Sequence, residues 1–199
     1  SIKSKPAYDI ALQLSEEFVI NHAFRLSFLR AECYNPTKAA ARMVKYFETK
    51  KELFGAEMLT KTITYEDLDS DSQTVAARGS ISILPTRDTL GRYVAVTASE
   101  YHLSSLITVD IMSKVAWYML SAIAEDETTQ IKGFVVITYS INSQLQPTEV
   151  NNKMWWATMT VGSSIPLRIS SFHHCYNAKP LSPMLKIVTI AESSWLCVR

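Results

Sequence analysis

Apolar residues recur every three or four positions between residues 36 and 55, which is the spacing of an amphipathic helix. The apolar stripe comprises Ala40, Met43, Val44 and Phe47. The opposite face carries the basic residues Lys38, Arg42 and Lys45. Asn35 and Pro36 have the side chains that favour a helix start, and Gly55 is suited to its end. The pattern therefore predicts an amphipathic helix of about five turns.

Two shorter segments with helical spacing precede this helix, at residues 8–20 and 23–32. Three short helices with brief connections predict an antiparallel bundle over residues 1–70. Bundles this small seldom fold alone, so we expect it to dock on the rest of the chain. The acidic stretch 64–73 follows, and we expect it to be a solvated linker or helix that leads to a second region.

From residue 75 onward, short β-rich segments alternate with longer helical ones. Strands are predicted at residues 80–84, 93–97, 133–139 and 168–175. Helices are predicted at residues 108–124, 147–161 and 182–191. This alternation is typical of an α/β domain with crossover connections, so residues 75–199 are predicted to form a mostly parallel sheet flanked by helices.

The predicted helix 108–124 is apolar on nearly all sides. Such a helix is either deeply buried or lines an apolar cavity, and burial on every side is hard to arrange in 199 residues. The other two helices of this region are also apolar, so their surface exceeds what one short sheet covers. The excess favours a cavity for a hydrophobic ligand, while ordinary core and a partner protein remain the alternatives.

Composition narrows the functional classes. The chain is 47% hydrophobic and 20% charged, with a net charge of +1, which is typical of a globular domain and argues against nucleic-acid binding through bulk electrostatics. The three cysteines, at positions 33, 175 and 197, are odd in number and far apart, so neither a disulfide framework nor a zinc site is expected. They favour reduced thiols and a cytoplasmic location.

The two ends of the sequence support further expectations. Residues 1–5 lack the apolar stretch of a signal peptide, and the longest apolar run, 115–124, is too short to span a membrane. The chain has no initiator methionine and stops within an apolar pattern. We therefore expect a part of a longer protein, truncated at its C-terminus.

Catalytic signatures are weak. His173 and Cys175 fall on one side of a predicted strand and His174 on the other, an arrangement that suits a pocket wall better than a Cys–His dyad. The five glycines form no nucleotide-binding motif, and the histidines lack the spacing of a metal site. A protein without catalysis, cofactor or metal is expected. The alternative, an enzyme that uses Cys175 and the histidines, requires those side chains to converge.

Four strings, in order, resemble the Sec14-like (CRAL-TRIO) family. Residues 24–32 (FRLSFLRAE) are similar to its "LLRFLRAR" helix, and residues 35–40 (NPTKAA) to the cap "KFDVEKAA". Residues 87–94 (RDTLGRYV) resemble its "D-x-x-GRPV" turn. Residues 165–177, with IPLR and FHHCYN, resemble "YPxR…FHxIN". Leu167 stands where phosphoinositide-binding members carry an acidic residue, so a generic hydrophobic ligand is the expectation.

The resemblance implies a helical lead-in and a lipid-binding α/β domain whose segment 182–191 is a gate that opens at a membrane. It implies non-catalytic binding and transfer of a phospholipid or other hydrophobic molecule by a monomer in transient contact with membranes. The expected ligand contacts are Val96, Ala116, Leu120, Phe134, Val136, Tyr139, Met154, Phe172, His174, Met184, Leu185 and Val188. Arg168 and Arg199 are candidates for the headgroup, with a structural contact as the alternative for Arg168. A protein-interaction module, with a partner segment in the apolar groove, is the alternative function.

Overall fold

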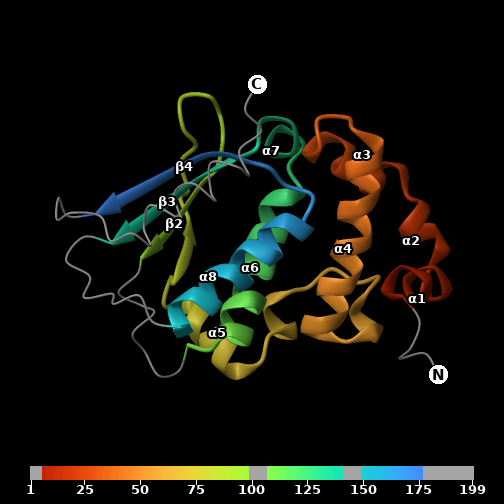
Figure 1. Cartoon of the computed structure of the whole chain (residues 1–199), viewed down its shortest axis with the longest axis horizontal. Coiled ribbons are helices and arrows are strands. Elements are labelled where there is room, and N and C mark those ends of the chain that lie inside the picture. Colours follow the sequence, from red (N-terminus) through yellow and green to blue (C-terminus); the bar gives the residue numbers. More distant parts are fainter. Residues whose placement is uncertain (1–5, 99–106, 141–148, 177–199) are drawn as a thin grey trace.

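The computed structural model describes residues 6–98, 107–140 and 149–176 (Figure 1). The helices are α1 (Ala7–Leu14), α2 (Glu16–Ile20), α3 (His22–Ala31), α4 (Pro36–Phe54), α5 (Ser70–Ala77), α6 (Val109–Ala124), α7 (Glu127–Lys132) and α8 (Glu149–Ser164). The strands are β1 (Ile81–Ile83), β2 (Val94–Ala98), β3 (Phe134–Ser140) and β4 (Ile169–Tyr176). The predicted helix 182–191 lies outside the described residues.

The strands form a mixed sheet in the order β1-β2-β3-β4. The β1–β2 pair is antiparallel, whereas β2–β3 and β3–β4 are parallel. Helices α6 and α8 lie between the sheet and the N-terminal helices, with α4 against α8 (Figure 1). The predicted α/β class and the four strands are therefore confirmed, with one antiparallel pair in the sheet.

Local signals account for most helix ends. The Asn35 side chain accepts a hydrogen bond from the Lys38 amide at 3.1 Å, and Gly55, at φ +87°, ends α4, as predicted. One helix was predicted over residues 8–20, and this prediction is wrong because the segment forms two helices, α1 and α2. Ser15 is extended at φ −158°, and its hydroxyl accepts from the Phe18 amide to begin α2. A serine cap in the middle of an apolar pattern restarts the helix in a new direction.

Helix α7 is absent from the sequence-based prediction because its short, polar sequence carries no apolar period. Asp126 caps it by accepting from the Thr129 amide at 2.7 Å, and Gly133, at φ +74°, ends it. A Cβ on Gly133 would overlap the Arg168 carbonyl oxygen, so glycine also permits the close approach of β3 and β4. Asp126 and Gly133 are therefore the sequence signals for α7, and a search for apolar spacing alone overlooks them.

The acidic stretch 64–73 is largely exposed and mostly helical, which agrees with the expected solvated helix rather than with a linker. It forms a 3₁₀ turn, Tyr65–Asp67, and the start of α5, with Leu68 buried in the core. Asp69 accepts from the Ser72 amide at 2.8 Å and pairs with Lys114 of α6 at 3.0 Å. The stretch therefore docks α5 on α6, and its charges act as caps and ion pairs.

Helix α6 is buried over most of its surface, so the ordinary-core alternative accounts for most of its apolar residues, although Asp110 and Ala122 are exposed. Val115 and Ala116 have no exposed surface, and Trp117 is 1% exposed. The indole of Trp117 packs on the rings of Tyr46 and Phe54 of α4, at centroid distances of 5.0 and 6.1 Å. The N-terminal helices supply the cover that the sheet alone lacks, so one buried apolar cluster includes residues from both predicted regions.

The only charged residue among the buried positions described is Lys50, which is 1% exposed. Its ammonium group donates hydrogen bonds to the carbonyl oxygens of Leu59, at 3.2 Å, and Lys61. It also lies 5.6 Å from the ring centroid of Tyr46 and 5.9 Å from that of Phe18. Burial lowers the pKa of Lys50 to about 8, so the ammonium form is costly despite these contacts.

The stability of the protein is expected to rise as the pH increases from 8 to 10. The pKa of Lys50 is about 8 in the fold against an ordinary 10.5, so the unfolded chain binds more protons in this window. The gain is roughly 2 kcal/mol. Burial raises the pKa of Tyr46 above its ordinary 10.0, so the unfolded chain loses that proton first and stability falls again above about pH 10.

Urea unfolding across pH 7 to 11 measures this effect. A Lys50→Met variant is expected to lose the rise between pH 8 and 10. A Lys61→Met variant, changed at an exposed lysine, is expected to keep it. A rise of the same size in Lys50→Met would assign it to other groups.

Candidate functional site

The sheet has one face in the core and one face turned away from α6 and α8. Ala95, Phe134 and Val136 belong to the buried cluster that includes α6. Because side chains alternate along a strand, their neighbours point to the opposite side. The outer face, as defined by this alternation and the strand register, comprises Val94, Val96, Val135, Ile137, Tyr139, Ser171, His173 and Cys175.

The outer face is apolar in its middle and more polar toward the carboxyl ends of the strands. Across the strands, Val96 and Ile137 lie in register with His173, and Tyr139 lies in register with Cys175. Val135 is 5% exposed and Tyr139 is 40% exposed, so exposure increases along β3. The outer face is therefore an apolar surface with hydrogen-bonding groups at its carboxyl end.

Arg92 and Asp88 close the amino end of the outer face. The Arg92 guanidinium donates to the hydroxyls of Ser170, at 3.1 Å, and Ser171, at 3.2 Å. Its ion pair with Asp88 is 2.7 Å long, and both side chains are largely buried. Hydrogen bonds from Arg92 lower the pKa of Asp88, with the larger effect from the Arg92 backbone and the smaller from its side chain. The arginine is therefore fully engaged within the fold.

Several predicted ligand contacts lie on the core side instead. Ala116 and Leu120 of α6 are buried with Phe134 and Val136 in the central cluster, and Phe172 packs against that cluster. Val96 and Tyr139 lie on the outer face. The predicted set is thus divided between the two faces of the sheet and does not form one wall.

The remaining predicted contacts fall where no side chain is described. Met154 is in α8 and His174 is in β4, but only their backbone is described. Met184, Leu185 and Val188 lie outside the described residues, as does the headgroup candidate Arg199.

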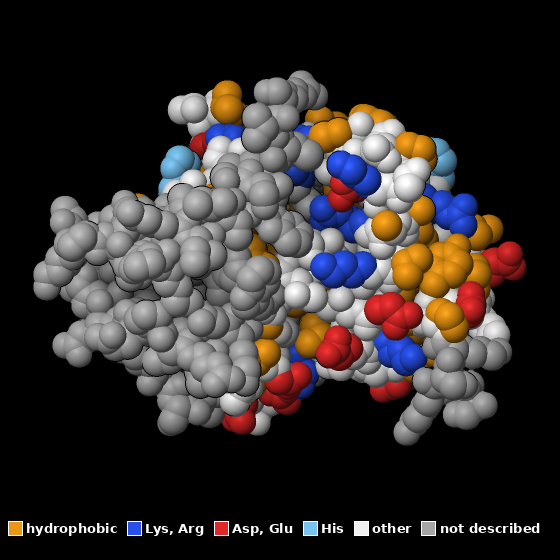
Figure 2. All heavy atoms as spheres, viewed as in Figure 1, with side chains coloured by type: hydrophobic (Ala, Val, Ile, Leu, Met, Phe, Trp, Pro, Cys, Tyr) orange, Lys and Arg blue, Asp and Glu red, His pale blue; other side chains and the backbone are white. Residues whose placement is uncertain are grey.

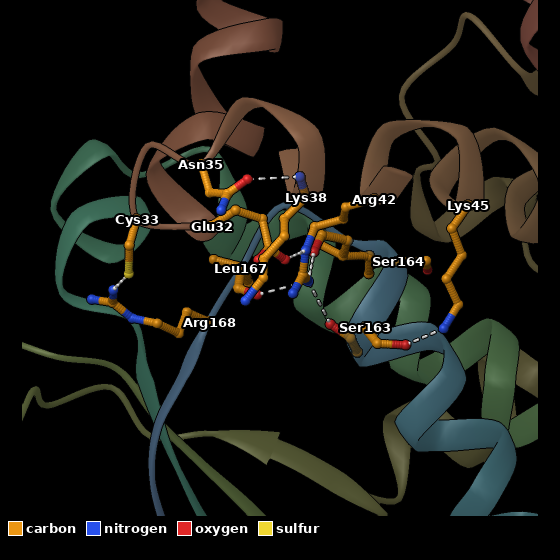
Figure 3. A network of polar contacts seen from close by, with 12 residues as sticks. Glu32, Cys33, Asn35, Lys38, Arg42, Lys45, Ser163, Ser164, Leu167 and Arg168 are labelled. Carbon is orange, nitrogen blue, oxygen red and sulfur yellow. Dashed lines mark hydrogen bonds and ion pairs between the residues drawn. The ribbon is translucent and has the colours of Figure 1, made fainter. Parts of the chain in front are cut away.

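Arg168, the other headgroup candidate, lies at the amino end of β4, whereas Tyr139 lies at the carboxyl end of the neighbouring β3. Its guanidinium donates to the Cys33 sulfur at 2.8 Å and to the Ile131 carbonyl oxygen at 2.7 Å (Figure 3). These contacts match the structural alternative for this residue and tie the α3–α4 turn to α7.

Two basic residues of α4, Arg42 and Lys45, form a clasp on the end of α8 (Figure 3), whereas Lys38 on the same face is exposed. Arg42 donates to the carbonyl oxygens of Ile165, at 2.9 Å, and Leu167, at 3.1 Å, and pairs with Glu32 at 2.5 Å. Lys45 donates to the Ser163 hydroxyl, and burial, assisted by the charge of Arg42, lowers its pKa. The cations satisfy carbonyl groups that a helix C-terminus leaves without partners.

Among the described residues, His173 and Cys175 do not have the geometry of a catalytic dyad. His173 and Cys175 are two apart on one strand, side by side rather than facing each other. Among the described residues, no three histidine, cysteine or acidic side chains lie close enough to hold a metal ion.

A hollow of about 420 Å³ opens on α1, between Asp9, Leu12, Gln13 and Glu16, on the far side of the molecule from the sheet.

Val94, Val135 and Ile137 are residues of the outer face that the sequence prediction omitted. The available signal was strand alternation, which divides the residues of each strand between two faces but does not say which face packs against the helices.

Within the described residues, no helix combines the length and apolar character needed to cross a membrane. In comparisons with known proteins, no family model and no curated protein matches this chain.

Proposed function

We propose that this chain binds one lipid or other hydrophobic molecule on the outer face of its sheet and carries it without covalent chemistry. The observation that supports this most is the apolar middle of that face, centred on Val96 and Ile137, on the side opposite α6 and α8. Each ligand methylene moved from water onto such a surface contributes about 0.8 kcal/mol, so an acyl or isoprenoid chain binds with few directed bonds.

The order of elements is also consistent with a Sec14-like carrier. A helical lead-in precedes a sheet whose first pair is an antiparallel hairpin and whose later pairs are parallel. The turn that carries the "D-x-x-GR" resemblance is the hairpin in which Asp88 accepts from the Leu90 amide at 3.0 Å and pairs with Arg92. Those residues hold the amino end of the outer face closed.

The polar end of the outer face favours a ligand with a small, weakly charged head. Tyr139 and His173 offer hydrogen bonds there, and Cys175 adds a polarisable wall. The described residues that the register places on this face include no lysine, arginine, aspartate or glutamate, and Arg92, at its amino end, is already bound to Asp88 and two serines. A phosphoinositide, with several negative charges, would find no described cation on this face that is free to receive it.

Native mass spectrometry of the purified protein, followed by solvent extraction, tests the proposal. The expected result is a bound lipid, together with uptake of a fluorescent fatty acid delivered from cyclodextrin. Uptake is expected to fall at least about tenfold in Ile137→Glu, because a carboxylate on the apolar floor must be desolvated when the ligand binds.

Val44→Glu is the matched control, since Val44 is 46% exposed on α4, away from the sheet. It is expected to keep full uptake. The proposal would be contradicted if the unmodified protein yielded no extracted lipid and took up no fatty acid. That result would favour a partner segment as the occupant of the outer face. Equal uptake by Ile137→Glu and Val44→Glu would place the ligand elsewhere.

A further inference from the structure

Three of the most exposed apolar side chains stand on three neighbouring segments. Tyr34, 64% exposed, is in the turn between α3 and α4; Leu90, 59% exposed, is in the β1–β2 hairpin; and Ile131, 49% exposed, is near the end of α7. These segments lie along the upper edge of the molecule in Figure 1. Figure 2 shows hydrophobic side chains at this edge, with lysine and arginine side chains beside them.

Two cations connect the three segments. The Lys132 ammonium group of α7 donates to the Leu90 carbonyl oxygen of the hairpin at 2.9 Å. Arg168 bridges α7 and the α3–α4 turn through its hydrogen bonds to the Ile131 carbonyl oxygen and the Cys33 sulfur. The amino edge, defined here as Tyr34, Leu90, Ile131, Lys132 and Arg168, is therefore one connected surface with its apolar tips held outward.

The charge of the amino edge is not neutralised within the described part of the chain. The ion pairs found there include neither Lys132 nor Arg168. The nearby acids are already committed to other arginines: Asp88 to Arg92, Asp126 to Arg87 and Glu127 to Arg30. The two cations bond only to neutral acceptors in the contacts described, so their positive charge remains available to an anion.

Single exposed apolar residues are normal on protein surfaces, but three connected ones flanked by cations are a specific combination. Tyrosine, leucine and isoleucine on three separate segments suit a soft surface that each side chain can enter individually. A stable protein interface would instead require a continuous complementary area of about 800 Å² on each partner. Lysine and arginine at the same level suit a layer of lipid phosphates.

We propose that the amino edge docks this protein on the surface of an anionic membrane. Tyr34, Leu90 and Ile131 enter the boundary between headgroups and acyl chains, while Lys132 and Arg168 meet the phosphates. Three tips and two cations give weak, reversible binding of the kind that a carrier needs. The inference extends the proposed function, but docking does not depend on a bound ligand.

Co-sedimentation with vesicles tests the docking. The protein is expected to bind vesicles of phosphatidylserine and phosphatidylcholine, and to bind pure phosphatidylcholine at least about tenfold more weakly. Lys132→Ser is expected to weaken binding to the anionic vesicles about fivefold, because one cation near such a surface contributes about that factor. Leu90→Asp is expected to weaken it about tenfold or more, through loss of an apolar tip and added repulsion.

The matched controls change the same residue types far from the amino edge. Lys61→Ser removes an exposed lysine and Leu14→Asp alters a side chain that is 50% exposed on α1. Both are expected to bind like the unmodified protein, and circular dichroism checks that each variant is folded. No binding to anionic vesicles, or equal losses in edge and control variants, overturns the inference. Fatty-acid uptake from cyclodextrin is measured without membranes, so the proposed function is judged separately.

Discussion

A Trp117→Ala variant is expected to lose about 4 kcal/mol of unfolding free energy, the largest loss anticipated for a single substitution in this chain. Trp117 is 1% exposed and lies where α6 meets α4. Removal of the indole deletes its transfer free energy and leaves a cavity that rigid helices on both sides cannot fill. Denaturant unfolding monitored by circular dichroism at 222 nm would measure the loss.

Two further variants show whether the loss comes from the contact between the helices. Trp117→Phe keeps a ring in the site and is expected to lose about half as much. In a double-mutant cycle with Tyr46→Ala, the two effects are expected to be coupled by about 1 kcal/mol, since the rings are 5.0 Å apart. Additive effects would mean that the indole stabilises α6 without contributing to its attachment to α4.

An Arg42→Met variant is expected to lose about 3 kcal/mol of unfolding free energy. Methionine keeps the apolar stem but removes the donors that hold the carbonyl oxygens of Ile165 and Leu167. It also leaves the carboxylate of Glu32, only 15% exposed, without its cation. The cost is mainly that of burying these acceptors unpaired, rather than the net strength of the ion pair.

Lys38→Met is the matched control, because Lys38 is an exposed cation one turn earlier on the same helix. Its loss is expected to be below about 0.5 kcal/mol. Arg42→Lys keeps the charge but not the planar fork, and we expect it to recover part of the stability. If Arg42→Met and Lys38→Met behaved alike, the clasp would be a surface contact of no energetic consequence.

These two residues attach the N-terminal helices to the side of the domain that faces away from the proposed ligand. Trp117 joins α4 to α6, and Arg42 joins α4 to the end of α8, while the outer face lies across the sheet. The bundle therefore supports the helices on which the sheet rests. We expect destabilising changes at Trp117 or Arg42 to reduce ligand uptake only through unfolding, unlike Ile137→Glu, which acts at the face itself.

The elements of this fold could largely be predicted from local patterns. The apolar spacing and the cap at Asn35 predicted α4, and the continuous apolar run after Gly133 predicted β3. Where prediction failed, a local polar group overrode a pattern or a pattern was missing. Ser15 divided one expected helix in two, and α7 depends on the cap at Asp126.

The tertiary structure alone decided which surfaces meet. The sequence by itself determined that α6 is apolar on nearly all sides and that α4 has a basic face, but both facts are compatible with several surroundings. Packing decided that α6 is covered by other elements and that Arg42 bonds carbonyl groups more than a hundred residues away. The reason is physical, because helical and strand periods assign residues to faces, whereas only contacts distant in sequence decide what each face touches.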